Sequence, residues 1–278
     1  MPKNTFRTIV LSLVFGYSSH VLAQSAEWKA IDAEVRSLSS SGQYDRGILA
    51  AQRAMEVAIQ SEGVDGLRVA DSASSLAWLY VQKGNYKQAE AFYAKALSIR
   101  EKSPDADPRL VARNLFGLAG VHDKQNHYGL AEDFYRRATE AVERTFGPTD
   151  PYTAGTLHNF AAFYYDRKEF SKAEGLYRRA LAAADSVPEP NRSTVMSRAL
   201  RTNLATQIAE ACRKQGKFED AFEFYERARA SVQVELGRFN RQKLIMYLEA
   251  LVPLYKEIGK TSQAELLEKE ISALRATP

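Results

Sequence analysis

The sequence predicts an all-α fold, an α-solenoid of about six antiparallel helix pairs. One observation behind this prediction is a repeat. The stretch GNYKQAEAFYAKAL at 84–97 recurs as NHYGLAEDFYRRAT at 126–139 and as KEFSKAEGLYRRAL at 168–181, with a constant spacing of 42 residues. A second observation is that small and apolar residues follow a helical period within each repeat. A fixed period of this size is typical of a solenoid, in which each unit buries its sides against its neighbours.

One position marks the same place in every repeat and predicts a helix after it. The markers are Tyr44, Tyr86, Tyr128, Phe170, Phe218 and Thr261. After Tyr86 come Ala89, the apolar pair Phe92 and Tyr93, and then Ala96. These offsets place the residues on one face of a helix, and the alanines allow a neighbouring helix to approach closely.

A second helix is predicted before each marker. An apolar residue lies ten positions upstream, as Leu76, Leu118, Phe160, Ile208 or Leu251, and alanine follows it in four of the five repeats. A turn separates the two helices, and it contains Gly84, Gly216 or Gly259, where a helix end favours the left-handed conformation. Each repeat is therefore predicted to be an antiparallel helix pair.

The joints between repeats carry helix-start signals. Asp107-Pro108 and Asp150-Pro151 place an N-cap acid before a proline at the first helical position. Six extra residues around 187–194 precede the repeat of Ile208, and we expect them to form a surface loop.

The stretch GPTDPYTAGTLHNFAAFYYDRKEFSKAEGLYRRAL at 147–181 resembles the tetratricopeptide repeat (TPR), in the 42-residue form of kinesin light chains and many bacterial proteins. The resemblance implies a right-handed superhelix, formed by a single array over residues 24–278. The predicted units are 27–60, 69–102, 111–145, 152–186, 199–235 and 241–276. The four central units match well, and the first and last are degenerate, as end caps of such arrays are.

The first 23 residues are predicted to be a secretory signal peptide. Lys3 and Arg7 precede the apolar stretch TIVLSLVFGY, and cleavage is expected after Ala23. The alternative, an N-terminal membrane-attached helix, needs a longer apolar stretch, and no segment is long enough to span a membrane. The protein is therefore expected to be periplasmic or secreted.

Charge and motif content argue against several classes of function. Without the signal segment, 36 Lys and Arg stand against 34 Asp and Glu, so no nucleic-acid partner is predicted. The lone Cys212 cannot form an internal disulfide, and no metal-binding histidine spacing is present. Gly259-Lys260-Thr261 lacks the upstream glycine of a phosphate-binding loop, because Leu254 stands there. We predict no enzyme activity, no cofactor and no metal.

The resemblance implies that a peptide or helix of a partner protein binds on the concave face, which the first helices line. Asn159 stands where an asparagine of this family commonly bonds a ligand's main chain, and a side-chain amide can both donate and accept. Gln207 could do the same, whereas Ser75 and Gly117 depart from the pattern. The other predicted partner-binding residues on this face are Trp78, Gln82, Arg113, Lys124, Tyr165, Asn203 and Lys214.

Alternatives to these assignments stay open at the level of sequence. Trp78 could pack between units, and Arg113 and Lys124 could form an ordinary solvated surface. The favoured function is an exported scaffold that binds another protein. The alternatives are a structural component that self-assembles into a homo-oligomer through its end units, and an enzyme built on a helical array. Whether the bound segment is extended or helical is also open.

Overall fold

The computed structural model describes residues 23–188, 195–233 and 238–276, and within these ranges it contains twelve helices and no strand. The predicted all-α class is confirmed. Most of the predicted signal peptide, residues 1–22, and most of the predicted insertion, residues 189–194, lie outside the described residues. In the described ranges, no helix is both long and apolar enough to cross a bilayer.

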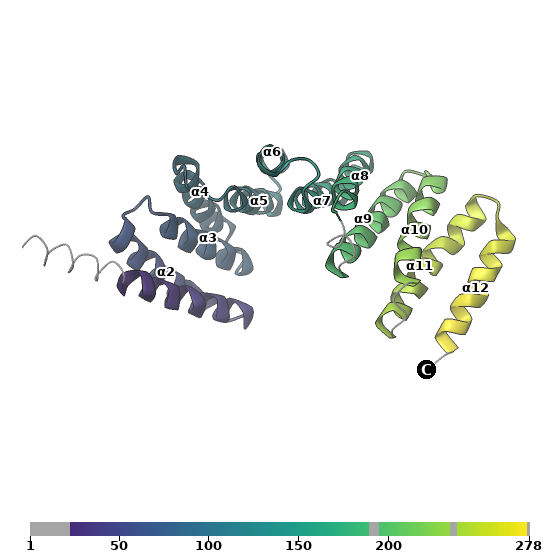
Figure 1. Ribbon diagram of the computed structural model, residues 1–278, viewed down its shortest axis with the longest axis horizontal. Helices are drawn as coiled ribbons and strands as arrows, with labels where there is room; N and C mark the ends of the chain where they lie inside the picture. Colours follow the sequence, from purple (N-terminus) through teal and green to yellow (C-terminus); the bar gives the residue numbers. More distant parts are fainter. Residues whose placement is uncertain (1–22, 189–194, 234–237, 277–278) are drawn as a thin grey trace, which may run out of the picture. The chain divides into compact units, whose positions relative to one another are not determined.

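The twelve helices form the six predicted pairs (Figure 1). The first helix covers residues 23–40 and precedes α2. The other helices are α2 (Tyr44–Glu62), α3 (Leu67–Gln82), α4 (Tyr86–Lys102), α5 (Pro108–Lys124), α6 (Tyr128–Phe146), α7 (Pro151–Asp166), α8 (Phe170–Asp185), α9 (Val195–Lys214), α10 (Phe218–Gln233), α11 (Arg238–Glu257) and α12 (Thr261–Ala276).

The repeated marker is the first residue of the second helix in every pair. Each of α2, α4, α6, α8, α10 and α12 begins at its marker. The predicted starts of α5 and α7 are also confirmed, because Asp107 accepts a hydrogen bond from the backbone N–H of Arg109 and Asp150 accepts one from that of Tyr152. Pro108 and Pro151 are the first residues of these helices.

Two compact units make up the chain, one ending at Ala138 and the other beginning at Thr139. The N-terminal unit contains the first helix, α2 to α5 and the first half of α6. The C-terminal unit contains the rest of α6 and α7 to α12. Each unit is a set of helix pairs packed through the same repeated positions.

Alanines form the contacts between helices. Alanines at two repeated positions of the second helices have no exposed surface. At the first position they are Ala89, Ala131, Ala173, Ala221 and Ala264, and seven residues later they are Ala96, Ala138, Ala180 and Ala228. Larger side chains fill the adjacent space, and in the N-terminal unit Tyr93, Leu97 and Leu115 pack around Ala89. The alternation of small and large residues lets helices approach closely without leaving cavities.

The turn between the helices of a pair has one residue in the left-handed region. Four of these residues are Gly42, Gly84, Gly216 and Gly259, with φ of 71°, 71°, 74° and 75°. Asn126 and Lys168 occupy the same position in the other two described turns, with φ of 62° and 63°. Asparagine tolerates this conformation, whereas lysine is strained in it because its Cβ approaches the following carbonyl oxygen.

We therefore expect Lys168→Gly to raise the free energy of unfolding by about 1 kcal/mol. Urea denaturation followed by circular dichroism measures this change. Gly84→Ala is the matched control and should lower the free energy by a similar amount. A Lys168→Gly variant less stable than the wild type would contradict the assignment of strain.

Candidate functional site

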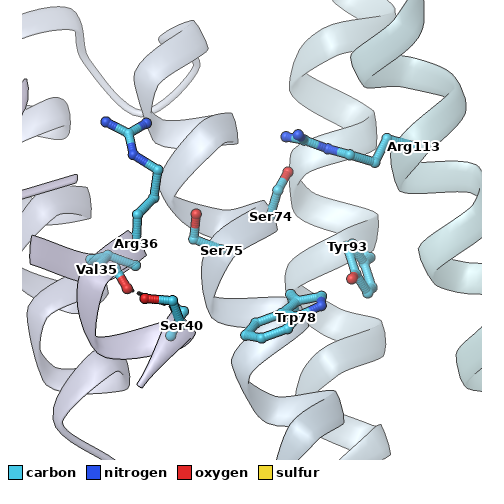
Figure 2. A pocket seen from close by; sticks show the side chains of 9 residues that line it. Val35, Arg36, Ser40, Ser74, Ser75, Trp78, Tyr93 and Arg113 are labelled. Atoms are coloured by element: carbon cyan, nitrogen blue, oxygen red, sulfur yellow. Dashed lines mark hydrogen bonds between the residues drawn. The ribbon is translucent and has the colours of Figure 1, made fainter. Parts of the chain in front are cut away.

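A groove of about 410 Å³ opens on the N-terminal unit, on the face that the first helices of its pairs form (Figure 2). We call it the Trp78 groove. Its lining comes from the first helix, α3, α4 and α5. The lining residues are Val35, Arg36, Ser39, Ser40, Ser74, Ser75, Trp78, Tyr93 and Arg113.

The aromatic wall of the groove consists of Trp78 and Tyr93. Trp78 lies on α3 with 41% of its surface exposed, and one edge of its ring contacts Tyr44 at a centroid distance of 6.0 Å. Tyr93 comes from α4 and is buried, yet its ring reaches the groove beside Trp78 (Figure 2). Trp78 therefore packs on a neighbouring helix and still presents its indole to solvent.

Two arginines stand at the rim, and their electrostatic surroundings differ. Arg36 forms an ion pair of 2.6 Å with Asp32, one turn earlier on the same helix. Arg113 on α5 forms no ion pair or hydrogen bond with any residue that the structure describes. Burial raises the pKa of the Asp32 carboxyl, and the nearby Arg36 and Arg113 counteract this rise. Arg113 is thus an exposed cation without a close ion pair, and it lines the same groove as the exposed indole of Trp78.

A buried polar network supports the floor of the groove. Arg100, only 2% exposed, donates hydrogen bonds to Asp71 Oδ1 at 2.6 Å and to Ser74 Oγ at 2.8 Å. Ser74 Oγ also lies 2.8 Å from Oδ1 of the buried Asn114. This network joins α3, α4 and α5 and fixes the helices that carry Trp78, Tyr93 and Arg113.

The predicted partner-binding residues are divided between the two units. In the N-terminal unit, Trp78 and Arg113 meet in the groove, whereas Gln82 and Lys124 are exposed at the ends of α3 and α5 outside its lining. In the C-terminal unit the predicted residues are exposed or half-buried; they are Asn159, Tyr165, Asn203, Gln207 and Lys214. Their role in partner binding stays a prediction.

In the C-terminal unit, Tyr165 lies close to a charged pair on α9. Burial raises the pKa of Tyr165, and Glu210 raises it further. Glu210 is held by Arg213 at 2.7 Å and accepts a short hydrogen bond from the Tyr225 hydroxyl. Glu210 therefore has partners within its own unit, and this cluster stabilises the packing of α9 and α10.

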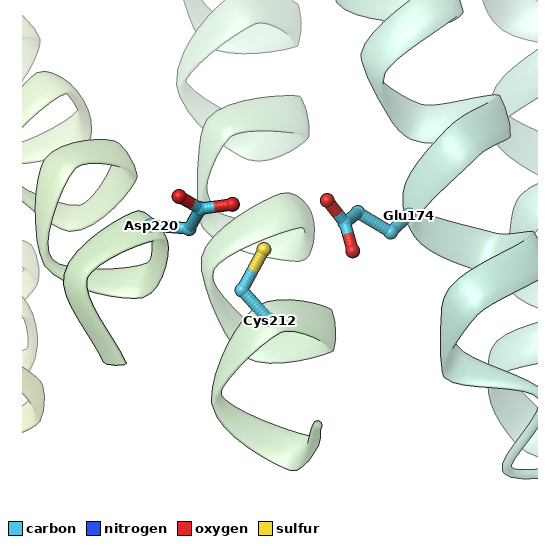
Figure 3. Close-up of side chains that lie close together, drawn as sticks. All are labelled: Glu174, Cys212 and Asp220. Atoms are coloured by element: carbon cyan, nitrogen blue, oxygen red, sulfur yellow. The ribbon is translucent and has the colours of Figure 1, made fainter. Parts of the chain in front are cut away.

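Glu174, Cys212 and Asp220 bring three potential metal-ligand atoms within 4.8 Å of one another (Figure 3). Arg178 bonds both carboxylates, with Nε 2.8 Å from Glu174 and Nη2 2.9 Å from Asp220. Lys217 donates to Glu174 at 2.7 Å. The thiol of Cys212 is buried, and this burial raises its pKa to about 11. A metal ion would have to displace a guanidinium here, so the cluster is best described as an ion-pair network.

Comparison with known proteins identifies the family. The model for the tetratricopeptide repeat matches residues 36–102, 82–144 and 110–186, which together cover more than half of the chain. The chain belongs to the tetratricopeptide repeat family. No curated protein matches the sequence.

Several solved TPR-like structures are similar to this chain. BtubC (BKLC) from P. vanneervenii is 23% identical with a TM-score of 0.65, over 84% of this chain and 91% of that one. A Podosopora anserina protein assigned as a kinesin light chain is 18% identical with a TM-score of 0.57, over 74% of this chain and 94% of that one. Pseudomonas aeruginosa pilF is 16% identical with a TM-score of 0.58, over 92% and 95%. At these identities the likenesses show the fold alone.

Of the nine lining residues of the groove in this TPR protein, only Trp78 and Arg113 were among the predicted site residues, and the largest of those missed are Arg36 and Tyr93. Arg36 stands 42 residues before Trp78, so the repeat spacing could have found it, had the first repeat been less degenerate. Tyr93 follows the periodic pattern of a core residue, and it is buried as that pattern predicts. Its second role in the groove depends on contacts between helices.

We expect Ser74→Ala to lower the free energy of unfolding by about 1–3 kcal/mol, because it leaves polar groups of the buried Arg100 and Asn114 unsatisfied. Urea denaturation measures this. Ser75→Ala, the neighbouring half-buried serine, is the control and should change stability by less than about 0.5 kcal/mol. Equal effects of the two substitutions would show that the network does not stabilise the floor.

The Glu174 network predicts a pH dependence. Burial alone would raise the pKa of Glu174, but hydrogen bonds from Lys217, Arg178 and Gln215 outweigh it and lower the pKa from 4.5 to about 2. Because the folded pKa lies below the unfolded one, the stabilisation is present above pH 4.5 and is lost as the pH falls toward 2.

Glu174→Gln should therefore flatten the dependence of the unfolding free energy on pH within this window. Urea denaturation at a series of pH values measures the slope. Glu223→Gln, at an exposed position of α10, is the control and should keep the wild-type slope. An unchanged slope in Glu174→Gln would contradict the lowered pKa.

Proposed function

We propose that this TPR protein is a non-enzymatic scaffold that binds a segment of another protein in the Trp78 groove. The observation that carries the proposal is that one groove is lined by an indole with 41% of its surface exposed and by the exposed Arg113, which forms no hydrogen bond or close ion pair within the described residues. Tryptophan and arginine are the residue types that most often dominate the energy of protein interfaces.

The energetics of the groove favour a ligand with both an apolar and an acidic group. Covering the exposed part of the Trp78 ring would contribute about 2 kcal/mol. A carboxylate placed against Arg113 would gain a charge-assisted hydrogen bond. Because packing and the buried Arg100 network hold the helices in place, the groove loses little entropy on binding.

An enzymatic function has less support in the groove. Its nine lining residues include no carboxylate, histidine or cysteine, so none of its serines has a general base among them. Burial raises the pKa of the Tyr93 hydroxyl, which makes it a weaker acid than a free tyrosine. These features suit recognition better than general acid–base catalysis.

Self-assembly through the end units also has less support. On α3, Val69, Leu76 and Leu79 are buried. The residues 42 positions earlier, on the first helix, are Glu27, Glu34 and Ser37, and all three are exposed. At the other end, Glu265 and Glu268 of α12 are exposed where α10 has Phe222 and the buried Tyr225. Apart from the exposed Leu266 of α12, the end helices therefore give a second copy few large apolar side chains on which to stack.

The proposal includes export. Residues 1–23 have the basic start, the apolar stretch and the small residue at the end that a signal peptide requires. We therefore place the scaffold in the periplasm or outside the cell, where partners are recruited after cleavage following Ala23.

A peptide-display selection on residues 24–278 tests the function. Sixteen-residue linear peptides selected on the wild type should bind Trp78→Ala and Arg113→Glu at least tenfold more weakly, because both contacts lie in the groove. Isothermal titration calorimetry gives the affinities. Lys87→Glu, with the same charge change at an exposed position of α4, should stay within about twofold of the wild type. Failure to enrich peptides, or equal binding to all variants, would contradict the proposal.

A further inference from the structure

Tyr93 occupies the space above Gly117 of α5. A Cβ placed on Gly117 would lie 2.5 Å from Cζ of the Tyr93 ring and 2.6 and 2.7 Å from its two Cε atoms. Gly120, one turn later on the same helix, has no heavy atom within 4 Å of such a Cβ. The glycine at 117 is thus needed for the Tyr93 ring to pass between α3 and α5 and reach the groove.

The N-terminal unit has no side-chain amide at the positions that correspond to Asn159. The position of Asn159 corresponds, in 42-residue steps, to Gly117, Ser75 and Ala33. None of these three carries a side-chain amide, and at Gly117 the Tyr93 ring fills the space that an amide would need. The ladder of amides that would clamp an extended chain is therefore missing from this unit.

Three of the four lining serines are engaged in hydrogen bonds within the described residues. Ser39 Oγ donates to the carbonyl of Val35 at 2.7 Å, and Ser40 Oγ donates to that of Ser37 at 2.9 Å. Ser74 belongs to the network around Arg100. Ser75 is the one lining serine that makes no hydrogen bond within the described part of the chain.

An extended segment and a helical segment would fare differently in this groove. An extended main chain brings N–H and C=O groups that lose water on binding and need new partners, and the groove lining has no side-chain amide, the group that can pair with both. A helix satisfies its own main chain and projects only side chains. An aromatic wall with the exposed Arg113 at its rim suits one apolar and one acidic side chain on the same face of a helix.

We infer that the Trp78 groove receives an amphipathic helix of a partner protein. The helix inserts one large apolar side chain against Trp78 and Tyr93 and presents a carboxylate, three or four residues away, to Arg113. Gly117 and Tyr93 act together as the determinant that selects a helix over an extended chain. This inference rests on the proposed function and specifies the conformation of the bound segment.

Matched peptides test the inference on the wild-type protein. The starting point is a selected sixteen-residue peptide whose binding requires Trp78 and Arg113. An alanine scan of this peptide first identifies the residues that do not contact the protein. Two derivatives, altered only at those residues, are then compared with the parent peptide. One derivative has an i,i+4 lactam bridge that fixes a helix, and the other has a central proline that prevents one. We expect the bridge to tighten binding at least threefold and the proline to weaken it at least tenfold.

A protein variant gives an independent readout. Ser75→Asn restores an amide at the position equivalent to Asn159, at a half-buried site. Because Ser75 lines the groove, the readout is the ratio of the affinities for the bridged and the proline derivatives. This ratio should stay within about threefold of the wild-type ratio, because a helix offers no main-chain groups to that amide. A gain of tenfold or more for the proline derivative relative to the bridged one would reveal main-chain recognition and overturn the inference.

The outcomes separate the two claims. If no peptide depends on Trp78 and Arg113, the proposed function fails and the inference fails with it. If peptides depend on both residues, yet tolerate proline and lose affinity on bridging, the groove binds an extended segment and only the inference is overturned.

Discussion

The close approach of helices through fully buried alanines is the constraint on which the rest of the structure depends. An alanine such as Ala89 leaves room for the large side chains of the next helix, and it recurs in five of the six pairs, with the buried Gly47 at this position in the first. Packing closes the sides of the pairs, whereas the face that the first helices form stays open in the N-terminal unit. The Trp78 groove lies on that face of the N-terminal unit.

The groove combines a fixed floor with a solvent-exposed rim. Arg100 is a buried charge, which is costly unless it is paired; its bonds to Asp71 and Ser74 join α4 to α3, and the contact of Ser74 with Asn114 adds α5. The rim carries Arg36 and Arg113, whose long side chains are exposed. The buried network is therefore separate from the exposed rim, which is the arrangement that the proposed binding function requires.

The sequence alone was sufficient for the fold class, the six pairs and the start of each second helix, because these follow from a period of 42 residues. It was also sufficient to identify Trp78 and Arg113 as surface residues of one face. The sequence predicted the left-handed residue of the turn at Gly84, because glycine favours this conformation. It gave no such indication at Lys168, because lysine rarely adopts a positive φ. Tyr93 was predicted only as a core residue, because the space above Gly117 that admits its ring exists only once α3, α4 and α5 are packed together.

The exposure of the rim has an evolutionary consequence. Trp78, Arg36 and Arg113 stand on three different helices, and the groove needs none of them to hold its floor together. Under the proposed function, exchange of the exposed Arg36 or Arg113 changes which partner is bound, while the buried alanine contacts and the Arg100 network are kept. Duplicated copies could thus diverge in specificity by a few surface changes, without passing through an unfolded ancestor.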